Sequence, residues 1–240
     1  MHSVKTMRLA VLAPLIAIAA LTVRGQQTDS APPPAGASNP AAGILRGTIE
    51  GESYVSPTGM FKIPVPVLPA LGGMITDTAN VVTFQDEINT HISIAAFPQD
   101  ATQHWQQSVL GTKDYLQYFL STFVVPDFAL SFPKIQLEKG GRFISNFDGA
   151  LVAYTLIPGG SMFASRIPRM LEDDKPPVAK RGNMLFVRNG YVFVISTELA
   201  ERVTEGSSYK QTPEQENDVL KERLIDIGNR MRFLKPAPAN

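Results

Sequence analysis

Residues 180–197, KRGNMLFVRNGYVFVIST, form the segment that limits the fold most strongly. Nearly all of them are strand formers, and the apolar run is broken once, at Asn189 and Gly190. This pair favours a two-residue type I′ turn because both positions need positive φ. That turn fixes the register and places three pairs on one face: Arg188–Tyr191, Phe186–Phe193 and Met184–Ile195. The other face carries Leu185, Val187, Val192 and Val194. Because both faces are apolar, other elements must cover the hairpin on both sides.

Two helical patterns are available for this cover. In the first, Thr112 is the expected N-cap, Pro126 the expected end, and the apolar stripe is Leu116, Phe119, Leu120 and Phe123. Upstream of it, Asp100 is expected to cap a short helical turn from which Trp105 packs inward. In the second, Thr212 and Gln215 are expected to form a capping box, Pro213 suits the first helical position, and the stripe is Leu220, Leu224, Ile227 and Met231.

The remaining patterns are strands. Hairpins are predicted over residues 54–63, with a turn at Pro57–Gly59, and over residues 82–95. A third is predicted over residues 135–144, turning at Gly140-Gly141, and a single strand over residues 150–157. The order of strands, helix, strands, helix predicts an α+β fold, in which a largely antiparallel sheet is sandwiched between helices.

The N-terminus resembles a secretory signal peptide over residues 1–25. Lys5 and Arg8 precede an apolar run of residues 9–23, and Val23 and Gly25 suit the −3 and −1 positions of a cleavage site. An uncleaved anchor is the alternative, but the run is shorter than the roughly 20 residues of a spanning helix. Met7 is an alternative start. We expect an exported protein with no stable membrane span after cleavage.

Residues 26–43 are rich in Pro and Ala, so they are expected to be a flexible linker, either a plain spacer or a point of attachment to the envelope. Residues 44–234 are predicted to form one domain, followed by a disordered tail at residues 235–240. The chain has 22 basic and 22 acidic residues, and signal removal takes away three basic ones, so no positive field attracts nucleic acid. The absence of cysteine excludes disulfides and thiol chemistry and favours a bacterial periplasmic or secreted protein.

The order of several segments resembles that of the PsbP-like family. These are YVSPTGMFKIPVP, VVTFQDEINTHISIAAFP, YLQYFLSTF, GALVAYTL, NMLFVRNGYVFVIST and LKERLIDIGNRMRF, within residues 50–234. The family includes the extrinsic PsbP subunit of photosystem II, a yeast protein that binds the Ran GTPase, and many exported bacterial proteins. The resemblance implies an α/β/α sandwich and a binding or assembly role, and it assigns no functional residue.

Few residues point to catalysis. Only His91 and His104 remain after signal removal, and neither has metal-ligand spacing. Asp86, Glu87 and His91 lie close in sequence. They could form a metal site with oxygen and nitrogen ligands, or they could simply be the polar residues of a solvated hairpin. Ser161 lacks the setting of a nucleophile elbow, and no phosphate-binding loop occurs. We therefore assign no catalytic, cofactor-binding or metal-binding residue, and expect a non-enzymatic protein. A carboxylate-based hydrolase or a divalent-metal-binding enzyme is the alternative.

The segment of residues 166–181 is the best candidate surface. It carries a mixture of charges next to the apolar hairpin, and it is either a solvated connector or a loop that recognises a partner. The basic residues assigned to partner binding are Arg166, Arg169, Lys180 and Arg181. The expected partner is an envelope or secreted protein.

Overall fold

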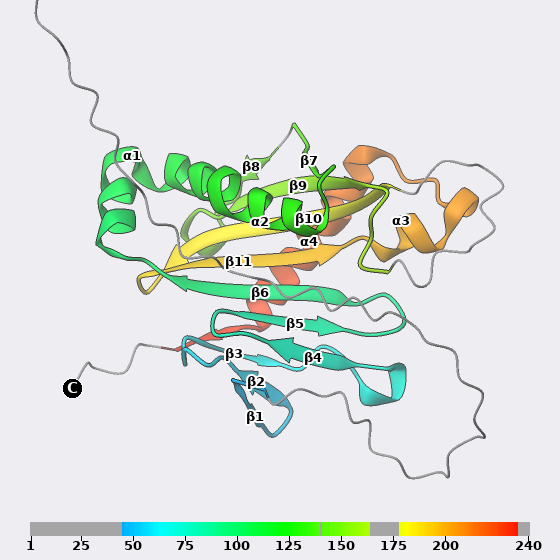
Figure 1. Ribbon diagram of the computed structural model, residues 1–240, viewed down its shortest axis with the longest axis horizontal. Coiled ribbons are helices and arrows are strands. Elements are labelled where there is room, and N and C mark those ends of the chain that lie inside the picture. The colour runs from blue at the N-terminus through cyan, green and yellow to red at the C-terminus, as the bar shows by residue number, and fades with distance from the viewer. Residues whose placement is uncertain (1–44, 140, 164–177, 235–240) are drawn as a thin grey trace, which may run out of the picture. The chain divides into compact units, whose positions relative to one another are not determined.

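A computed structural model describes residues 45–139, 141–163 and 178–234 of the 240-residue chain. The signal peptide, the linker and the tail predicted from the sequence lie outside these residues. In the part described, two antiparallel sheets and two groups of helices form an α+β fold, as the sequence predicts (Figure 1). No helix among the described residues is long and apolar enough to cross a membrane.

The larger sheet is built around the central hairpin. Its order is β4 (Met74–Asp77), β5 (Val81–Gln85), β6 (His91–Pro98), β11 (Tyr191–Glu198), β10 (Val178–Arg188), β9 (Leu151–Pro158) and β7 (Gln136–Leu137), with β8 (Arg142–Phe143) also beside β9. The smaller sheet has the order β1 (Thr48–Glu50), β2 (Ser53–Val55), β3 (Phe61–Pro64) and β12 (Arg232–Phe233).

The register predicted for the central hairpin is confirmed. Arg188 pairs with Tyr191 and Met184 with Ile195, and Asn189 and Gly190 have φ values of 53° and 74°, as a type I′ turn requires. β9 and β6 pair with the outer sides of β10 and β11. The hairpin is thus enclosed in the sheet plane, and only its two faces are left to cover.

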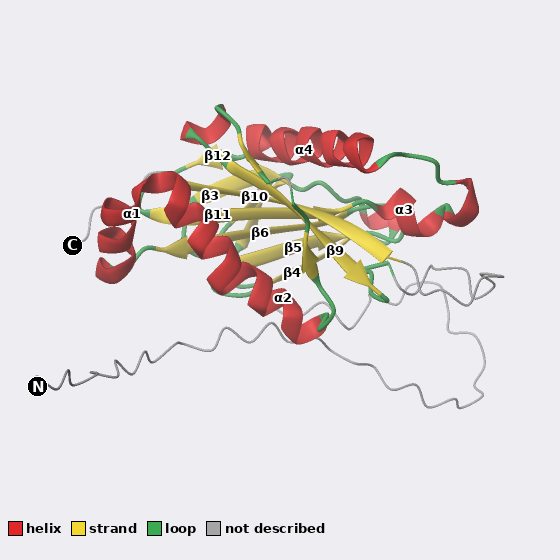
Figure 2. Ribbon diagram, turned by 90° about the horizontal axis from the view of Figure 1, so that it is seen from above, coloured by secondary structure: helices red, strands yellow, loops and turns green. Residues whose placement is uncertain are grey.

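Helix α4 (Pro213–Arg230) covers one face. Its capping box from Thr212 and Gln215 is present, and Leu220, Leu224 and Ile227 are buried, as the sequence predicts. They pack with Met184, Phe186, Phe193 and Ile195 of the hairpin. Figure 2 shows α4 on the opposite side of the sheet from α1 and α2. The short helix α3 (Ala200–Thr204) and the 3₁₀ turn η5 (Gly206–Ser208) connect β11 to α4.

The small sheet shares the α4 side of the core. Phe61 of β3 and Phe233 of β12 lie 6.2 and 5.1 Å from the ring of Phe193, and Tyr54 of β2 lies 5.7 Å from Phe84. The 3₁₀ turn η1 (Pro69–Leu71) lies between β3 and β4, and a second 3₁₀ turn, η3 (Asn146–Asp148), lies between β8 and β9 of the larger sheet. The sequence predicts the β2–β3 and β5–β6 hairpins but misses β1, β4 and β12.

The other face is covered by a longer helical segment than predicted. α1 (Ala101–Phe119) begins at a capping box formed by Asp100 and Gln103, and it continues through a π-helical turn, η2 (Leu120–Val124), into α2 (Val125–Ser131). The prediction that Pro126 ends the helix is wrong. Pro126 stands in the first turn of α2, where a missing backbone N–H is tolerated.

A bend divides α1 at Gly111, whose φ of 77° is not helical (Figure 1). The buried residues of α1, namely Tyr115, Leu116 and Phe119, all follow this bend and pack against Leu185, Val192 and Val194 of the hairpin. The prediction that Trp105 packs inward is wrong, because Trp105 precedes the bend and is 64% exposed.

The prediction of a hairpin that turns at Gly140-Gly141 is also wrong. β7 pairs with β9 at Leu156 and Thr155, and β8 pairs with β9 at Val152 and Leu151, both antiparallel. The two short strands therefore follow one another along the same edge of β9 instead of pairing with each other. Glycines inside an edge strand are typical of an interruption of this kind.

We expect Leu116→Ala in α1 and Leu224→Ala in α4 each to lower the free energy of unfolding by about 2–5 kcal/mol, because both side chains are fully buried, on opposite faces of the sheet. The matched control is Leu130→Ala in α2, whose side chain is 76% exposed and whose effect should stay within about 0.5 kcal/mol. Urea denaturation of the mature protein measures all three. If either buried substitution leaves the free energy of unfolding unchanged, the conclusion that helices cover both faces of the sheet is wrong.

Candidate functional site

Lys180 and Arg181 lie in strand β10, which begins at Val178. The prediction that residues 178–181 belong to a surface loop is therefore wrong, since their apolar neighbour Ala179 continues the strand pattern. Both basic side chains are fully buried and, as neighbours in a strand, point to opposite faces of the sheet. Arg166 and Arg169 lie outside the described residues, so their role in partner binding stays a prediction.

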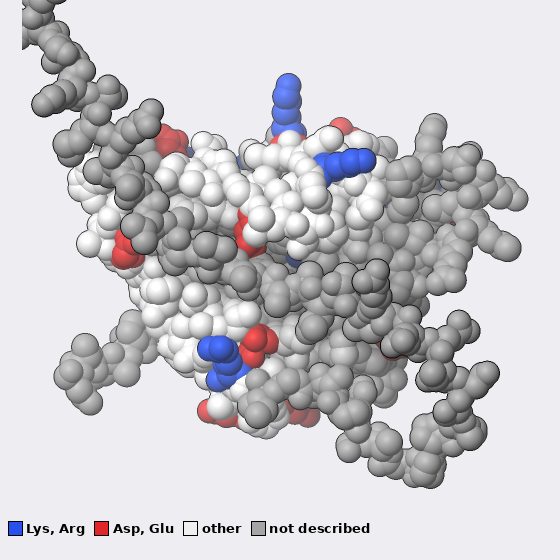
Figure 3. Space-filling view, in the orientation of Figure 1, with Lys and Arg blue, Asp and Glu red and all other residues white. Residues whose placement is uncertain are grey.

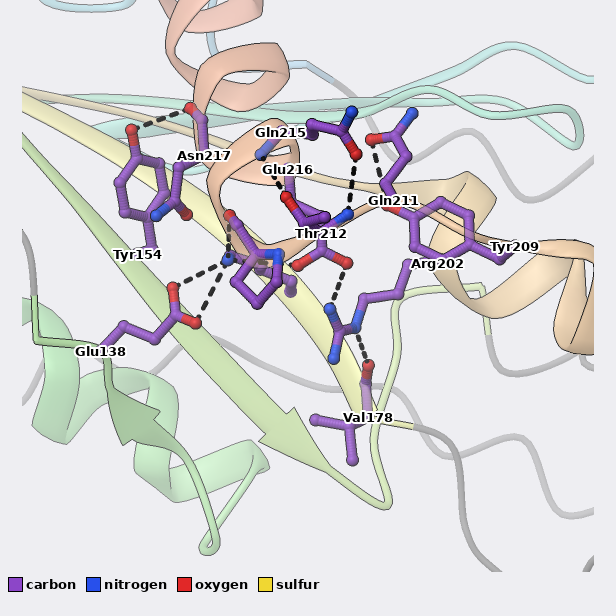
Figure 4. A network of polar contacts seen from close by, with 12 residues as sticks. Glu138, Tyr154, Val178, Arg202, Tyr209, Gln211, Thr212, Gln215, Glu216 and Asn217 are labelled. Carbon is purple, nitrogen blue, oxygen red and sulfur yellow. Dashed lines mark hydrogen bonds and ion pairs between the residues drawn. The ribbon is translucent and has the colours of Figure 1, made fainter.

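Lys180 faces α4 and is fully paired. Its Nζ lies 2.9 Å from Glu138 Oε2 and 3.2 Å from Glu216 Oε2, and it donates to the carbonyl of Pro213 at 3.4 Å. Arg202 completes the group, because it donates from Nη1 to Glu216 and from Nε to the carbonyl of Val178 at 2.7 Å. Figure 4 shows these side chains converging at the start of α4.

This network has a structural explanation. Its two cations and two carboxylates balance, and a buried ion pair of this kind needs every partner in place. A cavity of about 400 Å³ adjoins it, lined by Val178, Arg202, Val203, Gly206, Tyr209, Gln211 and Glu216. The charged side chains that line this cavity, Arg202 and Glu216, form an ion pair with each other. The network therefore holds α4 on the sheet, with each of its cations in contact with a carboxylate.

Arg181 faces the opposite side, toward α2, and it is not paired in this way. Its Nε, Nη1 and Nη2 atoms are buried and have no hydrogen-bond partner in the described part of the chain. The guanidinium carbon lies 4.8 Å from the ring centroid of Phe128, a cation–π contact. Burial lowers the pKa of Arg181 to about 10, while the nearby carboxylate of Glu198 acts in the other direction. Arg181 thus remains a cation at neutral pH.

Glu198 stands opposite Arg181 on β11, but its carboxylate is engaged elsewhere. It accepts hydrogen bonds from the hydroxyl of Ser161 and, at 2.9 Å, from the backbone N–H of Met162. The backbone N–H of Phe163 in turn donates to Ser161 Oγ at 2.9 Å. Ser161 is therefore a buried structural hydroxyl that holds the segment after β9 onto Glu198.

The same face of the sheet carries a second row of polar side chains. Asn183 donates to Thr155 Oγ1 at 3.3 Å and accepts from Ser196 Oγ at 2.8 Å. Farther along the row, the hydroxyls of Thr83 and Ser93 lie 3.2 Å apart. We call the two cross-strand rows together the polar half-face: Thr83, Gln85, His91, Ser93, Thr155, Arg181, Asn183, Ser196 and Glu198. It adjoins the apolar part of this face that α1 covers.

His91 connects the polar half-face to a cavity. The cavity measures about 320 Å³ and is lined by Gly72, Met74, Gln85, Asp86, Glu87, His91, Met162 and Phe163. His91 is buried, its Nδ1 has no partner among the described residues, and its ring lies 6.4 Å from that of Phe163. Burial and then the charge of Arg181 lower the pKa of His91 to about 3, so the imidazole is neutral at physiological pH.

The structure brings Asp86, Glu87 and His91 to this one cavity. Within the described residues, however, no three His, Asp or Glu side chains are placed to hold a metal ion together. Asp86 Oδ1 instead accepts the backbone N–H groups of Ile88, Asn89 and Thr90. Burial opposes ionisation of Asp86, but these hydrogen bonds outweigh it and lower its pKa. The carboxylate is thus used to close the β5–β6 turn.

A second feature lies on the first half of α1. Trp105, Val109 and Leu110 are 64%, 63% and 43% exposed, and no residue of α1 before Gly111 is buried. Figure 3 shows that the surface over α1 and α2 is mostly uncharged where it is visible. This surface, which we call the α1 face, is defined by Trp105, Val109 and Leu110.

The described residues define an α+β protein with one antiparallel sheet between an α1–α2 layer and a layer of α4 and the small sheet. No protein-family model matches the chain, and no curated protein matches it. Among solved structures, the chain is similar to a protein from Bacteroides thetaiotaomicron, at 10% identity and a TM-score of 0.38. That alignment covers 78% of this chain and 50% of the other, so the chain spans half of that protein's length.

Two further solved structures are similar to this chain. Cyanobacterial PsbP from Synechocystis sp. PCC 6803 is 13% identical, with a TM-score of 0.43, over 83% of this chain and 99% of its own. The Saccharomyces cerevisiae Ran-binding protein Mog1p is 10% identical, with a TM-score of 0.43, over 80% and 97%. The resemblance drawn from the sequence is thus met again among solved structures. Identities and TM-scores this low transfer no ligand, partner or residue role to this chain.

We expect His91→Gln to flatten the pH dependence of stability below neutrality. The folded pKa of about 3 lies below the unfolded value near 6.5, so the unfolded chain binds the proton first, and stability present above pH 6.5 is lost as the pH falls toward 3. Between pH 7 and pH 5 this loss amounts to about 2 kcal/mol in the wild type. Urea denaturation at both pH values measures it.

The control is His104→Gln, because His104 is exposed on α1. It should keep the wild-type loss of stability between the two pH values. If His91→Gln shows the same loss as the wild type and His104→Gln, the imidazole of His91 is not buried in the neutral form.

Proposed function

We propose that this chain is an exported, non-enzymatic protein of the bacterial cell envelope that binds a partner protein through the α1 face. The single observation that carries the binding role is the exposure of Trp105 and Val109 on a helical segment that buries nothing of its own. A helix of about ten residues is marginal without tertiary packing. A partner that covers this face supplies the packing that the domain does not.

The composition of the α1 face suits a protein partner. Trp is among the residues enriched at the energetic centres of interfaces, where a large apolar surface is removed from water. Trp105 and Val109 are four residues apart, so they lie on the same side of the helix. Charged side chains are sparse on the visible surface over α1 and α2 (Figure 3). An uncharged partner surface with an apolar groove fits these properties.

Export rests on the sequence of residues 1–25, and the binding role on the described domain. A protein without cysteine gains no stability from disulfides outside the cell, so its core must suffice. The core on both faces of the central hairpin is the source of this stability that we propose. The loop with Arg166 and Arg169 is a second proposed contact, because it precedes β10 and carries most of the charge in that part of the sequence.

No observation on the described residues favours the alternative of a carboxylate-based hydrolase or a metal-binding enzyme. Asp86 is engaged in its turn, and Ser161 donates to a carboxylate instead of to a histidine. Calorimetric titration of the mature protein with calcium, manganese and zinc discriminates the two functions. A stoichiometric heat that disappears on Asp86→Asn or His91→Gln substitution would support the metal-binding enzyme over our proposal.

We expect the exported protein to begin at Gln26, because cleavage follows Gly25. Intact-mass measurement on protein from the periplasm or medium of a bacterial host gives the new N-terminus directly. The control is Gly25→Tyr, which places a large residue at the cleavage site and should leave the full-length chain in the membrane fraction. Full-length wild-type protein in that fraction would instead establish an uncleaved anchor.

We expect Trp105→Ala combined with Val109→Ala to reduce partner recovery at least tenfold, because truncating a central interface Trp typically costs roughly 2 kcal/mol or more of binding free energy. The measurement is quantitative mass spectrometry of proteins crosslinked to the tagged mature protein in intact cells. Leu130→Ala is the matched control, since it removes another exposed apolar side chain, from α2. Deletion of residues 166–177 tests the loop separately.

Both helix substitutions are at exposed positions, so unfolding does not explain a loss of recovery, and circular dichroism verifies this. Recovery that is equal for the wild type and the Trp105 and Val109 variant refutes the α1 face as the binding surface. If the loop deletion alone abolishes recovery, the binding site lies on the loop.

A further inference from the structure

Lys180 and Arg181 offer an internal comparison within one strand. They are adjacent and equally buried, yet Lys180 contacts two carboxylates and a carbonyl, whereas Arg181 has no hydrogen-bond partner among the described residues. Buried charged groups are normally paired and hydrogen bonded, because desolvation without compensation is costly. The Lys180 side of the sheet follows this rule and the Arg181 side does not.

The contacts that Arg181 does make leave its donors unused. The guanidinium carbon lies 4.8 Å from the ring centroid of Phe128, and the carboxylate of Glu198 provides a nearby opposite charge. Neither accepts a hydrogen bond from Nε, Nη1 or Nη2, because Glu198 accepts from Ser161 and Met162 instead. The edge of the guanidinium therefore presents several coplanar N–H donors without an acceptor.

Coplanar donors of this kind match a particular chemical class. An oxyanion such as a carboxylate or a phosphate accepts two parallel hydrogen bonds from a guanidinium, and the ionic character of both groups strengthens them. The contact with Phe128 stabilises the cation without supplying an oxygen acceptor for its N–H groups. The neighbouring Asn183, Thr155 and Ser196 add polar groups on the same face.

The row of side chains that contains Arg181 also reaches the cavity at His91. Gln85, His91, Glu198 and Arg181 occupy one cross-strand row of β5, β6, β11 and β10. His91 lines the cavity of about 320 Å³, and Arg181 lies two strands away, roughly 10 Å at the usual strand spacing. Met162 and Phe163 line the same cavity and belong to the segment that is fixed on Glu198. His91 and Arg181 therefore stand on the same row, with Glu198 between them.

We propose that Arg181 is the anchor of a buried binding site for a small oxyanion, a carboxylate or a phosphate, on the cross-strand row that also reaches the cavity lined by His91, Met162 and Phe163. The site is separate from the α1 face, so its test is independent of the proposed partner. Glu198 limits its affinity, because its carboxylate repels a second anion on the same face.

Thermal unfolding of the mature protein tests the site with acetate and with inorganic phosphate as separate probes, each against sodium chloride at equal ionic strength. We expect at least one probe to raise Tm, by roughly 3–6 °C at about ten times its Kd, and calorimetry to give one bound anion per chain. Which probe acts distinguishes a carboxylate site from a phosphate site. Arg181→Met should abolish the rise, and Glu198→Gln should enlarge it, since repulsion is removed.

Two controls separate the site from general effects of charge. Arg142→Met removes an exposed arginine from β8, and it should keep the wild-type rise in Tm. Lys180→Met breaks the α4 network, so it should lower the starting Tm yet keep the rise. Arg181→Lys retains the charge without the planar donors. It should fold and show a smaller rise in Tm than the wild type. This variant keeps the proposal testable if Arg181→Met does not fold.

The proposal is overturned if neither acetate nor phosphate raises Tm above the chloride control. It is also overturned if the Arg181 variants respond as the wild type does. A rise that Arg142→Met abolishes would assign the effect to surface charge, and that result too would refute a site at Arg181.

Discussion

The double-sided burial of the β10–β11 hairpin is the constraint on which the remaining structure depends. Because β9 and β6 take its edges, only the two faces remain, and strand alternation sends neighbouring residues to different layers. Met184 and Phe186 require α4 and the small sheet, whereas Leu185 requires α1. The same alternation separates Lys180 from Arg181. One geometric rule thus fixes both the layer order and the surroundings of the two buried cations.

The features of the fold that were predictable are those whose signals are local. The Asn189–Gly190 turn sets its own register, and the Thr212 capping box starts α4 within four residues. The features that were missed depend on distant partners. β12 is only two residues long and exists because β3 is beside it, while the first half of α1 turns outward because Gly111 adopts a positive φ. Neither fact has a signal in its own short window of sequence.

The candidate site was harder to predict than the fold. In the sequence, Lys180 and Arg181 end a charged, proline-containing run, and such runs usually lie at the surface. Their burial is explained only by groups far along the chain: Glu216 lies 36 residues from Lys180, and Phe128 belongs to α2. A readable signal did exist, because the alternation of the apolar hairpin extends back through Ala179. If the two-residue period of the strand had been extended back to Lys180 and Arg181, it would have placed these two residues on opposite faces of the sheet.

The fold of the described residues does not itself require a charge at Arg181. A sheet face under α2 is covered equally well by an apolar side chain, and replacing buried ion pairs by apolar residues is often neutral or stabilising. Phe128 and Glu198 reduce the cost of the guanidinium, yet they leave its N–H groups without acceptors. Departures of this kind from consistent packing are expected at sites of binding, where stability is given up for recognition. The contrast with the fully paired Lys180, one residue away, shows that this chain can satisfy a buried cation where only structure is at stake.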